Sequence, residues 1–205
     1  MTARDMQIHR GRKFDQVLDG ARQVFLSDGF EGASVDEIAR VSRVSKATIY
    51  SYFADKRQMF TEVVRSECNR QAELALKLID KDRPPQEVLT EAARQLLGIV
   101  LSDFSQRVFR ICVAEADRFP ELGRAFYESG PVLGRRRLCE YLRAAEARGE
   151  LAIDDFDLAA DQFAELCKAT LWSRAVFGIQ SEFDEAEIDR IAGEASKTFL
   201  ARYGA

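Results

Sequence analysis

The segment from Ser34 to Lys56 holds the side chains whose types and spacing carry the clearest chemistry, and that chemistry would be recognition of double-stranded DNA. Lys46 stands near the start of a predicted helix, where its ammonium can donate to guanine O6 and N7 or to a phosphate. Ala47 is small enough to let a helix approach base edges, and its methyl group suits the methyl of thymine. The side chains spaced to contact backbone phosphates on either side of a groove are Ser34, Tyr52 and Lys56.

Three short helices must position these side chains. The apolar residues between Phe14 and Phe25 recur at the spacing of one helix face, and Asp28-Gly29 ends that helix because glycine accepts a left-handed conformation. Ser34-Val35-Asp36-Glu37 predicts a capping box, in which the serine oxygen accepts an N–H and the glutamate reaches back. A break at residues 42–44 follows, and Ser45 is placed to cap a third helix. This arrangement predicts a helix-turn-helix.

The rest of the chain also has a helical pattern, so the sequence predicts an all-α protein of about nine helices. Apolar stripes at helical spacing continue to the end of the chain, and neither an alternating strand pattern nor an internal repeat interrupts them. The two final helices are predicted at residues 156–177 and 184–203. We divide the chain into an amino-terminal helix-turn-helix domain, residues 1–57, and a larger helical bundle, residues 58–205.

The amino-terminal segment resembles the TetR-type DNA-binding domain. The resemblance covers roughly Arg12 to Val63 without insertions, and the residues that carry it are Phe25, Gly29-Phe30, Ser34–Ala39 and Val44–Lys56. It implies a homodimeric transcriptional repressor that binds a palindromic operator and is released by a small-molecule effector. It also implies groove-reading roles for Lys46, Ala47 and Tyr50, and phosphate contacts for Ser34, Thr48, Tyr52 and Lys56.

Two positions depart from the TetR pattern. Arg43 stands where that family usually has the glycine of the turn, and Ala47 stands where it often has glycine. An arginine held at positive φ costs on the order of 1 kcal/mol, so either the turn is slightly altered or Arg43 adds a phosphate contact. Tyr50 is left open between core packing and DNA contact, while Tyr52 favours DNA. The full predicted DNA-binding set is Ser34, Arg43, Ser45, Lys46, Ala47, Thr48, Tyr50, Tyr52 and Lys56.

The larger domain resembles the carboxy-terminal domain of the AefR-like subgroup, through residues 114–122, Gly130-Pro131 and Gly149-Glu150-Leu151. TetR-like proteins use this domain to dimerise and to sense ligands, with the last two helices forming a four-helix interface. The apolar stripe that fits such an interface is Ile188, Ile191, Ala192, Ala195 and Phe199. A second apolar stripe in the preceding helix is Ala159, Ala160, Phe163, Leu166, Cys167 and Thr170.

An effector pocket would lie between the middle helices of this domain. Its candidate lining residues are Phe104, Phe109, Cys112, Phe126, Tyr141, Phe163 and Trp172. The alternative for each of them is an ordinary packing position in the apolar core, without ligand contact. Their aromatic character favours an apolar or flat ligand, although the core of a helical bundle is apolar in any case.

The charge of the chain is distributed unevenly. The net charge is −4, yet the first 57 residues hold ten basic against eight acidic residues, and the remainder holds 20 against 26. A domain of charge +2 is thus followed by one of charge −6. The acidic domain should discourage stray contact with DNA, which leaves affinity to a few phosphate contacts in the first domain.

Several classes of protein are disfavoured by what the sequence lacks. No apolar run is long enough for a membrane span and no secretory signal is present, so we expect a cytoplasmic protein. The four cysteines form no C-x-x-C pair and the single histidine is His9, which argues against a metal site, a cofactor or an enzyme. The alternative function is a helical protein-interaction or small-molecule carrier protein without DNA binding.

Overall fold

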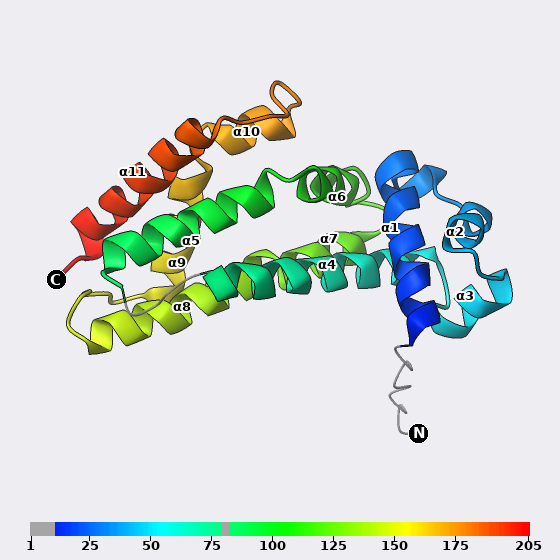
Figure 1. Cartoon of the computed structure of the whole chain (residues 1–205), viewed down its shortest axis with the longest axis horizontal. Coiled ribbons are helices and arrows are strands. Elements are labelled where there is room, and N and C mark those ends of the chain that lie inside the picture. The colour runs from blue at the N-terminus through cyan, green and yellow to red at the C-terminus, as the bar shows by residue number, and fades with distance from the viewer. Residues whose placement is uncertain (1–10, 79–82) are drawn as a thin grey trace. The chain divides into compact units, whose positions relative to one another are not determined.

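A computed structural model describes residues 11–78 and 83–205 of the chain (Figure 1). The predicted all-α class is confirmed. Within the described residues there are eleven helices rather than about nine, and the extended backbone contributes only an isolated bridge between Leu151 and Gly204. No helix in this part of the chain is long and apolar enough to cross a membrane. His9, the single histidine, lies outside the described residues.

The chain forms two compact units, and the first contains the predicted helix-turn-helix. It comprises residues 1–67 and 111–126, of which residues 11–67 and 111–126 are described. Its helices are α1 (Arg12–Gly32), α2 (Val35–Ser42), α3 (Lys46–Tyr52) and the first part of α4 (Lys56–Leu78). Parts of α6 (Asp103–Ala114) and α7 (Pro120–Ser129) complete it.

Aromatic rings build the core of the first unit. Phe25, Phe30 and Phe60 meet one another at centroid distances of 5.2 to 6.0 Å, and Phe14 stacks on Phe53 at 5.4 Å. All five rings are buried, and ring pairs of this kind add to the free energy gained by burying their area. The predicted end of the first helix at Asp28-Gly29 corresponds to a kink at Gly29, whose φ is 73°, before a last turn to Gly32.

Helices α1 and α2 lie close together at Gly20 and Ser42. A Cβ atom placed on Gly20 would lie 2.1 Å from Oγ of Ser42, and 3.0 Å from both the Cβ and the backbone nitrogen of Ser42. Only a glycine fits there without a shift of its neighbour. The absence of this side chain therefore sets the spacing between the first helix and the helix-turn-helix.

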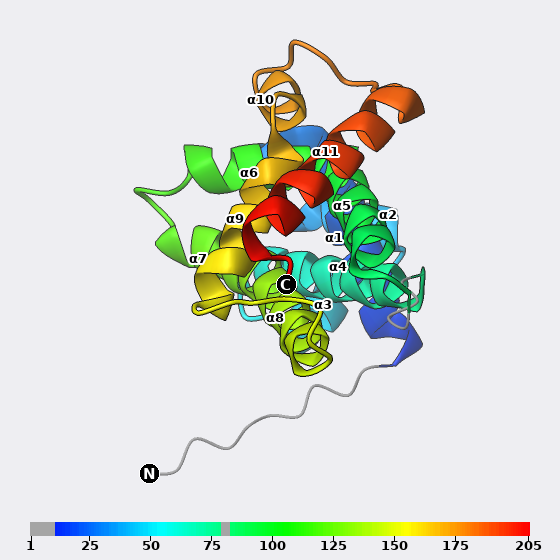
Figure 2. The same cartoon turned by 90° about the vertical axis from the view of Figure 1, so that its left-hand side faces the viewer.

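The second unit comprises residues 68–110 and 127–205, with residues 79–82 outside the described part. Its main helices are α5 (Pro85–Val100), α8 (Pro131–Ala147), α9 (Phe156–Lys168), α10 (Leu171–Val176) and α11 (Glu185–Tyr203). Figures 1 and 2 show α11 lying along α5 and beside α9, with α9 also packed on α8. One apolar core fills the space between them, and it includes Leu89, Leu142, Phe163 and Phe199.

The prediction of one continuous helix over residues 156–177 is wrong, because the chain breaks between α9 and α10. Ala169 leaves the helical conformation, and Thr170 takes a φ of 60° and a ψ of −42°. A positive φ is uncommon for any residue with a Cβ and is a genuine outlier for a β-branched one. The strain at Thr170 allows the chain to turn before α10 begins at Leu171.

The two apolar stripes of the last helices face the interior of their own unit. Ile191, Ala192, Ala195 and Phe199 of α11, with Ala159, Ala160, Phe163 and Cys167 of α9, are all buried members of the single-chain core. Ile188 and Leu166 pack against that core while partly buried, and Thr170 is exposed. The interpretation of the first stripe as an interface surface is therefore wrong, since these side chains already have their packing partners within one chain.

The predicted domain boundary after residue 57 falls at the start of α4. That helix runs without interruption from Lys56 to Leu78, and its residues divide between the compact units after Glu67. Residues 111–126 belong to the same unit as the helix-turn-helix. A functional division into residues 1–57 and 58–205 stays a prediction.

Candidate nucleic-acid interface

Two serine residues cap the amino ends of the helices in the predicted helix-turn-helix. The hydroxyl of Ser34 accepts a hydrogen bond from the backbone N–H of Glu37 at 3.1 Å, which starts α2. The expected return contact of a capping box is replaced by a pair of hydrogen bonds from the Arg40 guanidinium to the Glu37 carboxylate. Ser45 starts α3 by accepting the N–H of Thr48 at 3.1 Å. Both helix starts lie where the sequence predicts them.

The turn between α2 and α3 keeps the left-handed geometry that a glycine would adopt. Arg43 has φ 56° and ψ 39°, and its N–H and that of Val44 donate to carbonyls in the last turn of α2. Arg43 is exposed, so its side chain lies on the surface beside the start of α3. The left-handed conformation is thus present without a glycine, and a phosphate contact by Arg43 stays a prediction.

Glycine in place of Arg43 is expected to stabilise the protein. Because a side chain in the left-handed region costs about 1–2 kcal/mol, Arg43→Gly should raise the free energy of unfolding by up to about 1 kcal/mol. Arg43→Ala is the matched control, since it removes the guanidinium and keeps the Cβ. Denaturant unfolding of both variants measures the difference, and equal stabilities would show that the backbone conformation carries no strain.

The outer face of α3 presents the predicted groove-reading residues together. Ile49 is fully buried and anchors the helix, whereas Lys46, Ala47 and Tyr50 are exposed. The Tyr50 side chain is 54% exposed, which decides against core packing for this ring. Tyr52 is partly buried, and its edge meets the ring of Phe14 at 5.5 Å. Tyr50 is therefore free to contact a ligand, while Tyr52 is oriented by its aromatic neighbour.

The Lys46 ammonium is paired within the unit. It forms a salt bridge to the carboxylate of Asp36 on α2, and this hydrogen bond raises the pKa of Lys46 above its ordinary value. Both side chains are well exposed, so exchange for a phosphate or a base edge costs little. Thr48 is similarly engaged, because its hydroxyl lies 2.9 Å from Oγ of Ser45.

Lys56 lies at the start of α4 but points at backbone carbonyls. Its Nζ donates to the carbonyl oxygens of Glu31 at 3.2 Å and Ala33 at 3.0 Å, and it lies 4.7 Å from the centre of the Phe30 ring. An ammonium has three N–H groups, so one remains for a phosphate. Lys56 thus stabilises the end of α1 in addition to the phosphate contact predicted for it.

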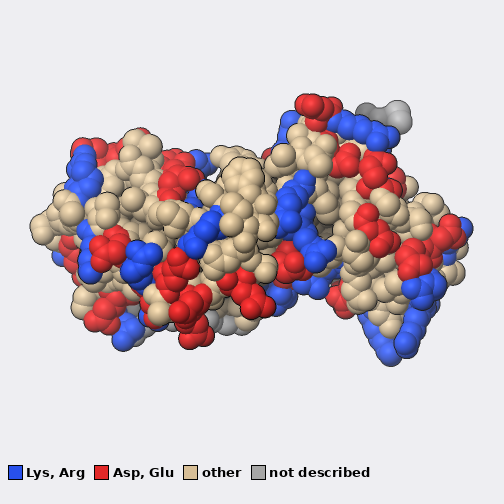
Figure 3. Space-filling model, turned by 90° about the horizontal axis from the view of Figure 1, so that it is seen from above, with Lys and Arg blue, Asp and Glu red and all other residues tan. Residues whose placement is uncertain are grey.

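The free backbone N–H groups in the first turn of a helix such as α4 are a natural site for a phosphate. Asp55 occupies part of this position, since its carboxylate accepts the N–H of Gln58 at 2.9 Å and also the Arg57 guanidinium. The Gln58 hydrogen bond lowers the pKa of Asp55. A phosphate at this helix end would have to share the position with a carboxylate. On the face drawn in Figure 3, basic side chains are interspersed with acidic ones.

The seven predicted pocket residues are divided between the two compact units, and a pocket that they share stays a prediction. Cys112 and Phe126 belong to the first unit, and the other five belong to the second. Tyr141 and Phe163 are members of the buried core, while Phe109 and Trp172 contact each other edge to face at 5.0 Å. A cavity of about 320 Å³ is present in the second unit, and none of the seven lines it.

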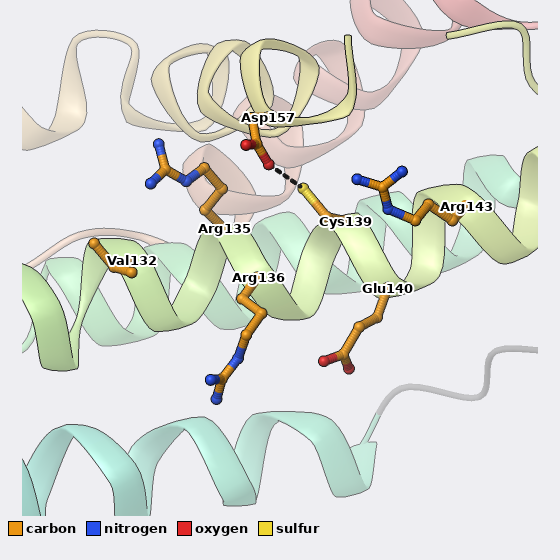
Figure 4. A pocket seen from close by; sticks show the side chains of 7 residues that line it. All are labelled: Val132, Arg135, Arg136, Cys139, Glu140, Arg143 and Asp157. Atoms are coloured by element: carbon orange, nitrogen blue, oxygen red, sulfur yellow. Dashed lines mark hydrogen bonds between the residues drawn. The ribbon is translucent and has the colours of Figure 1, made fainter. Parts of the chain in front are cut away.

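That cavity was missed by sequence reasoning. Its lining is contributed by six residues of α8 and one of α9: Val132, Arg135, Arg136, Cys139, Glu140, Arg143 and Asp157 (Figure 4). The signal that could have found it is the spacing of its arginines. Residues four apart share one face of a helix, and Arg135, Cys139 and Arg143 recur at that spacing.

The caps, the turn and the exposed face of α3 define a helix-turn-helix DNA-binding protein. Residues 17–63 match the family model described as bacterial regulatory proteins of the tetR family, and residues 87–205 match that of the AefR-like transcriptional repressor carboxy-terminal domain. The second match alone covers more than half of the chain. The chain belongs to the TetR family of DNA-binding transcriptional regulators, which is a family of regulators rather than enzymes.

Individual relatives agree with this assignment. The HTH-type transcriptional repressor BepR of Brucella suis is 30% identical over 144 residues, which are 67% of this chain and 68% of that protein. A solved TetR-family regulator from Mesorhizobium loti superimposes with a TM-score of 0.88 at 29% identity, over 95% of this chain and 98% of the other. The flavonoid-responsive regulator FrrA has a TM-score of 0.77 at 36% identity, with the same coverage.

Proposed function

We propose that the protein is a cytoplasmic, homodimeric repressor that binds a palindromic operator and is released by a small-molecule effector. The observation that carries the proposal is the exposed face of α3. Lys46, Ala47 and Tyr50 are exposed there, the helix is anchored by a fully buried Ile49, and its start is capped by Ser45. In this assignment these three residues read base edges in the major groove. Phosphate contacts come from the remaining predicted residues, which are Ser34, Arg43, Ser45, Thr48, Tyr52 and Lys56.

The proposed dimer would use the last two helical segments, residues 156–177 and 184–203. Since their apolar stripes are buried within one chain, the contact would use their outer faces. These include Leu158, which is exposed, and the small residues Gly193 and Ala201 of α11. A two-fold dimer presents two copies of α3 about one helical turn of DNA apart, which is why a palindrome is expected.

Release by an effector is supported by a relative and by the aromatic residues of the predicted larger domain, residues 58–205. FrrA, at 36% identity, is described as flavonoid-responsive. The residues proposed for an effector pocket in this chain are Cys112 and six aromatic residues: Phe104, Phe109, Phe126, Tyr141, Phe163 and Trp172. An effector that binds better to a conformation with mismatched α3 spacing would shift the population away from DNA.

Footprinting on the DNA upstream of the protein's own gene tests the proposal. We expect a protected palindrome whose half-sites are centred about one helical turn apart, or a multiple of it. Protection of a non-palindromic sequence would argue against the two-fold dimer. Absence of any protected site would favour the alternative, a helical protein-interaction or small-molecule carrier protein.

Two lysine variants separate phosphate contact from base reading. Lys56→Ala should weaken binding to every DNA sequence and reduce the salt dependence of the binding constant by about one ion. The substitution should also lower the melting temperature of the protein, because the Lys56 ammonium binds the carbonyl oxygens of Glu31 and Ala33. Lys46→Ala should in addition relax the base preference at one position of each half-site.

Fluorescence anisotropy with operator and mismatched duplexes at several salt concentrations measures both effects. Arg124→Ala is the matched control, since this exposed arginine of α7 lies outside the proposed DNA contacts and outside the helices proposed for the dimer. If Lys46→Ala and Lys56→Ala leave the affinity for the footprinted palindrome unchanged, the assignment of α3 and α4 to the interface is wrong.

A further inference from the structure

The groove on α8 has an arginine on each of its sides. Figure 4 shows Arg135, Cys139 and Arg143 on the side of α8 that faces Asp157 of α9, while Arg136 and Glu140 project from the opposite side. The cavity of about 320 Å³ between these side chains lies at the small end of the volumes that hold organic ligands. All of its lining residues belong to the second compact unit.

Two of the three guanidinium groups lack a carboxylate partner in the described part of the chain. Arg135 binds Asp161 at 3.1 Å. Arg143 lies 4.3 Å from the centre of the Phe156 ring, and Arg136 has no ion pair among the described residues. A guanidinium stacked on a ring is held in place and keeps its N–H groups for a second partner. Arg136 and Arg143, which line the groove from different sides of α8, therefore each keep N–H donors for an anion.

The acidic groups at the groove are already engaged. The carboxylate of Asp157 accepts a hydrogen bond from Sγ of Cys139 at 3.4 Å. Glu140 lies 3.8 Å from the guanidinium of Arg137, which does not line the groove. Among the described residues neither carboxylate forms an ion pair with Arg136 or Arg143.

The floor of the groove is uncharged. Cys139 is buried and also donates to the carbonyl oxygen of Phe156 at 3.3 Å. Burial, together with the neighbouring Asp157, raises the pKa of this thiol to about 11, so the sulfur carries no negative charge near neutral pH. The first turn of α9 borders the same groove through Asp157, and the positive end of a helix dipole also favours an anion.

We infer that this groove binds an organic anion with a flat apolar body and one or two carboxylates. Arg136 and Arg143 are seven residues apart on α8, which corresponds to about 10 Å along the helix, so the ligand spans two turns. Val132 supplies apolar contact, and the guanidinium forks match carboxylate geometry. This inference deepens the proposed function by naming the chemical class of an effector, and in that respect it depends on the proposed function.

Calorimetric titration of the full chain at constant ionic strength tests the site. The probes are terephthalate, benzoate and inorganic phosphate, and we expect affinity to fall in that order. Arg136→Gln and Arg143→Gln should each weaken terephthalate binding about tenfold, the scale of one charge-assisted contact of about 1.4 kcal/mol. Arg124→Gln, an exposed arginine of α7 outside the groove, is the matched control and should change nothing.

A variant whose side chain fills the groove distinguishes a specific binding site from nonspecific electrostatic attraction. Val132→Trp keeps every arginine and occupies the apolar part of the groove, so it should abolish terephthalate binding. Equal affinities for phosphate and terephthalate, or unchanged binding in Val132→Trp, would overturn the inference. A change of oligomeric state in Arg136→Gln and Arg143→Gln, without probe binding to the wild type, would assign the groove to a second copy of the chain and also overturn it.

The effector role is measured separately, by titrating terephthalate into the complex with the footprinted DNA. Binding of the probe with release of the DNA supports both the site and its role in regulation. If the probe binds and the arginine variants lose it, the anion site stands even when no operator is found, and only the proposed function fails. If the operator is bound and no probe binds, the inference fails and the proposed function stands.

Discussion

Alanine in place of Gly20 is expected to lower the free energy of unfolding of the helix-turn-helix unit by about 1–3 kcal/mol, the usual cost of overpacking. The new Cβ would lie 3.0 Å from the backbone nitrogen of Ser42, which cannot move without moving the end of α2. Because α2 leads directly into the turn before α3, operator affinity should fall along with stability. Thermal unfolding and DNA titration of the same preparation measure the two effects.

A control and a rescue make this result specific. Gly123 of α7 has open space around its Cα, so Gly123→Ala should stabilise the protein by about 0.5–1 kcal/mol through helix propensity. Ser42→Ala removes the hydroxyl that lies nearest to the new Cβ, and this hydroxyl has no hydrogen-bond partner among the described residues. The double variant should therefore recover part of the loss. A Gly20→Ala variant as stable as the wild type would show that α1 and α2 are free to separate.

Alanine in place of Tyr50 should lower operator affinity about tenfold or more, since a good contact to a base edge is worth about 1–3 kcal/mol. The free energy of unfolding should change by less than about 0.5 kcal/mol, as at other surface positions. This combination is expected because the ring is exposed on α3 while Ile49 carries the packing. Anisotropy titration and denaturant unfolding give the two quantities.

Tyr127 provides the matched control for this substitution. Its side chain is 55% exposed on α7, against 54% for Tyr50 on α3, so Tyr127→Ala removes the same group at the same exposure. Neither affinity nor stability should change. Should Tyr50→Ala bind the operator as the wild type does, Tyr50 is not a groove-reading residue, and the base contacts must come from Lys46 and Ala47 alone.

Much of the helix-turn-helix could be predicted because its signals are local. Ser34 and Ser45 cap helices whose start needs only the next three residues, and Gly29 marks the kink of α1. The left-handed turn at Arg43 could be predicted by resemblance, although no propensity rule selects arginine there. The exposure of Tyr50 could not be predicted, because an aromatic residue on a short helix can lie on the buried or on the exposed face until the packing of α3 is known.

The features that sequence reasoning missed depend on contacts between distant segments. Lys56 binds carbonyls at the end of α1, 23 and 25 residues away. Thr170 breaks a helix without a glycine or proline, because tertiary packing of α9 and α10 overrides local preference. Periodicity identified the apolar stripe of α11 correctly, but periodicity does not say whether such a stripe meets its own chain or a second copy.

The closed core of the second unit has a consequence for how the protein reaches its working state. Because this apolar core is closed within one chain, we expect the monomer to fold by itself, unlike obligate dimers, whose folding and association are one step. For a regulator held at few copies per cell, folding would then be independent of copy number. The number of copies would instead set how much of the protein is paired, and so how often an operator is occupied.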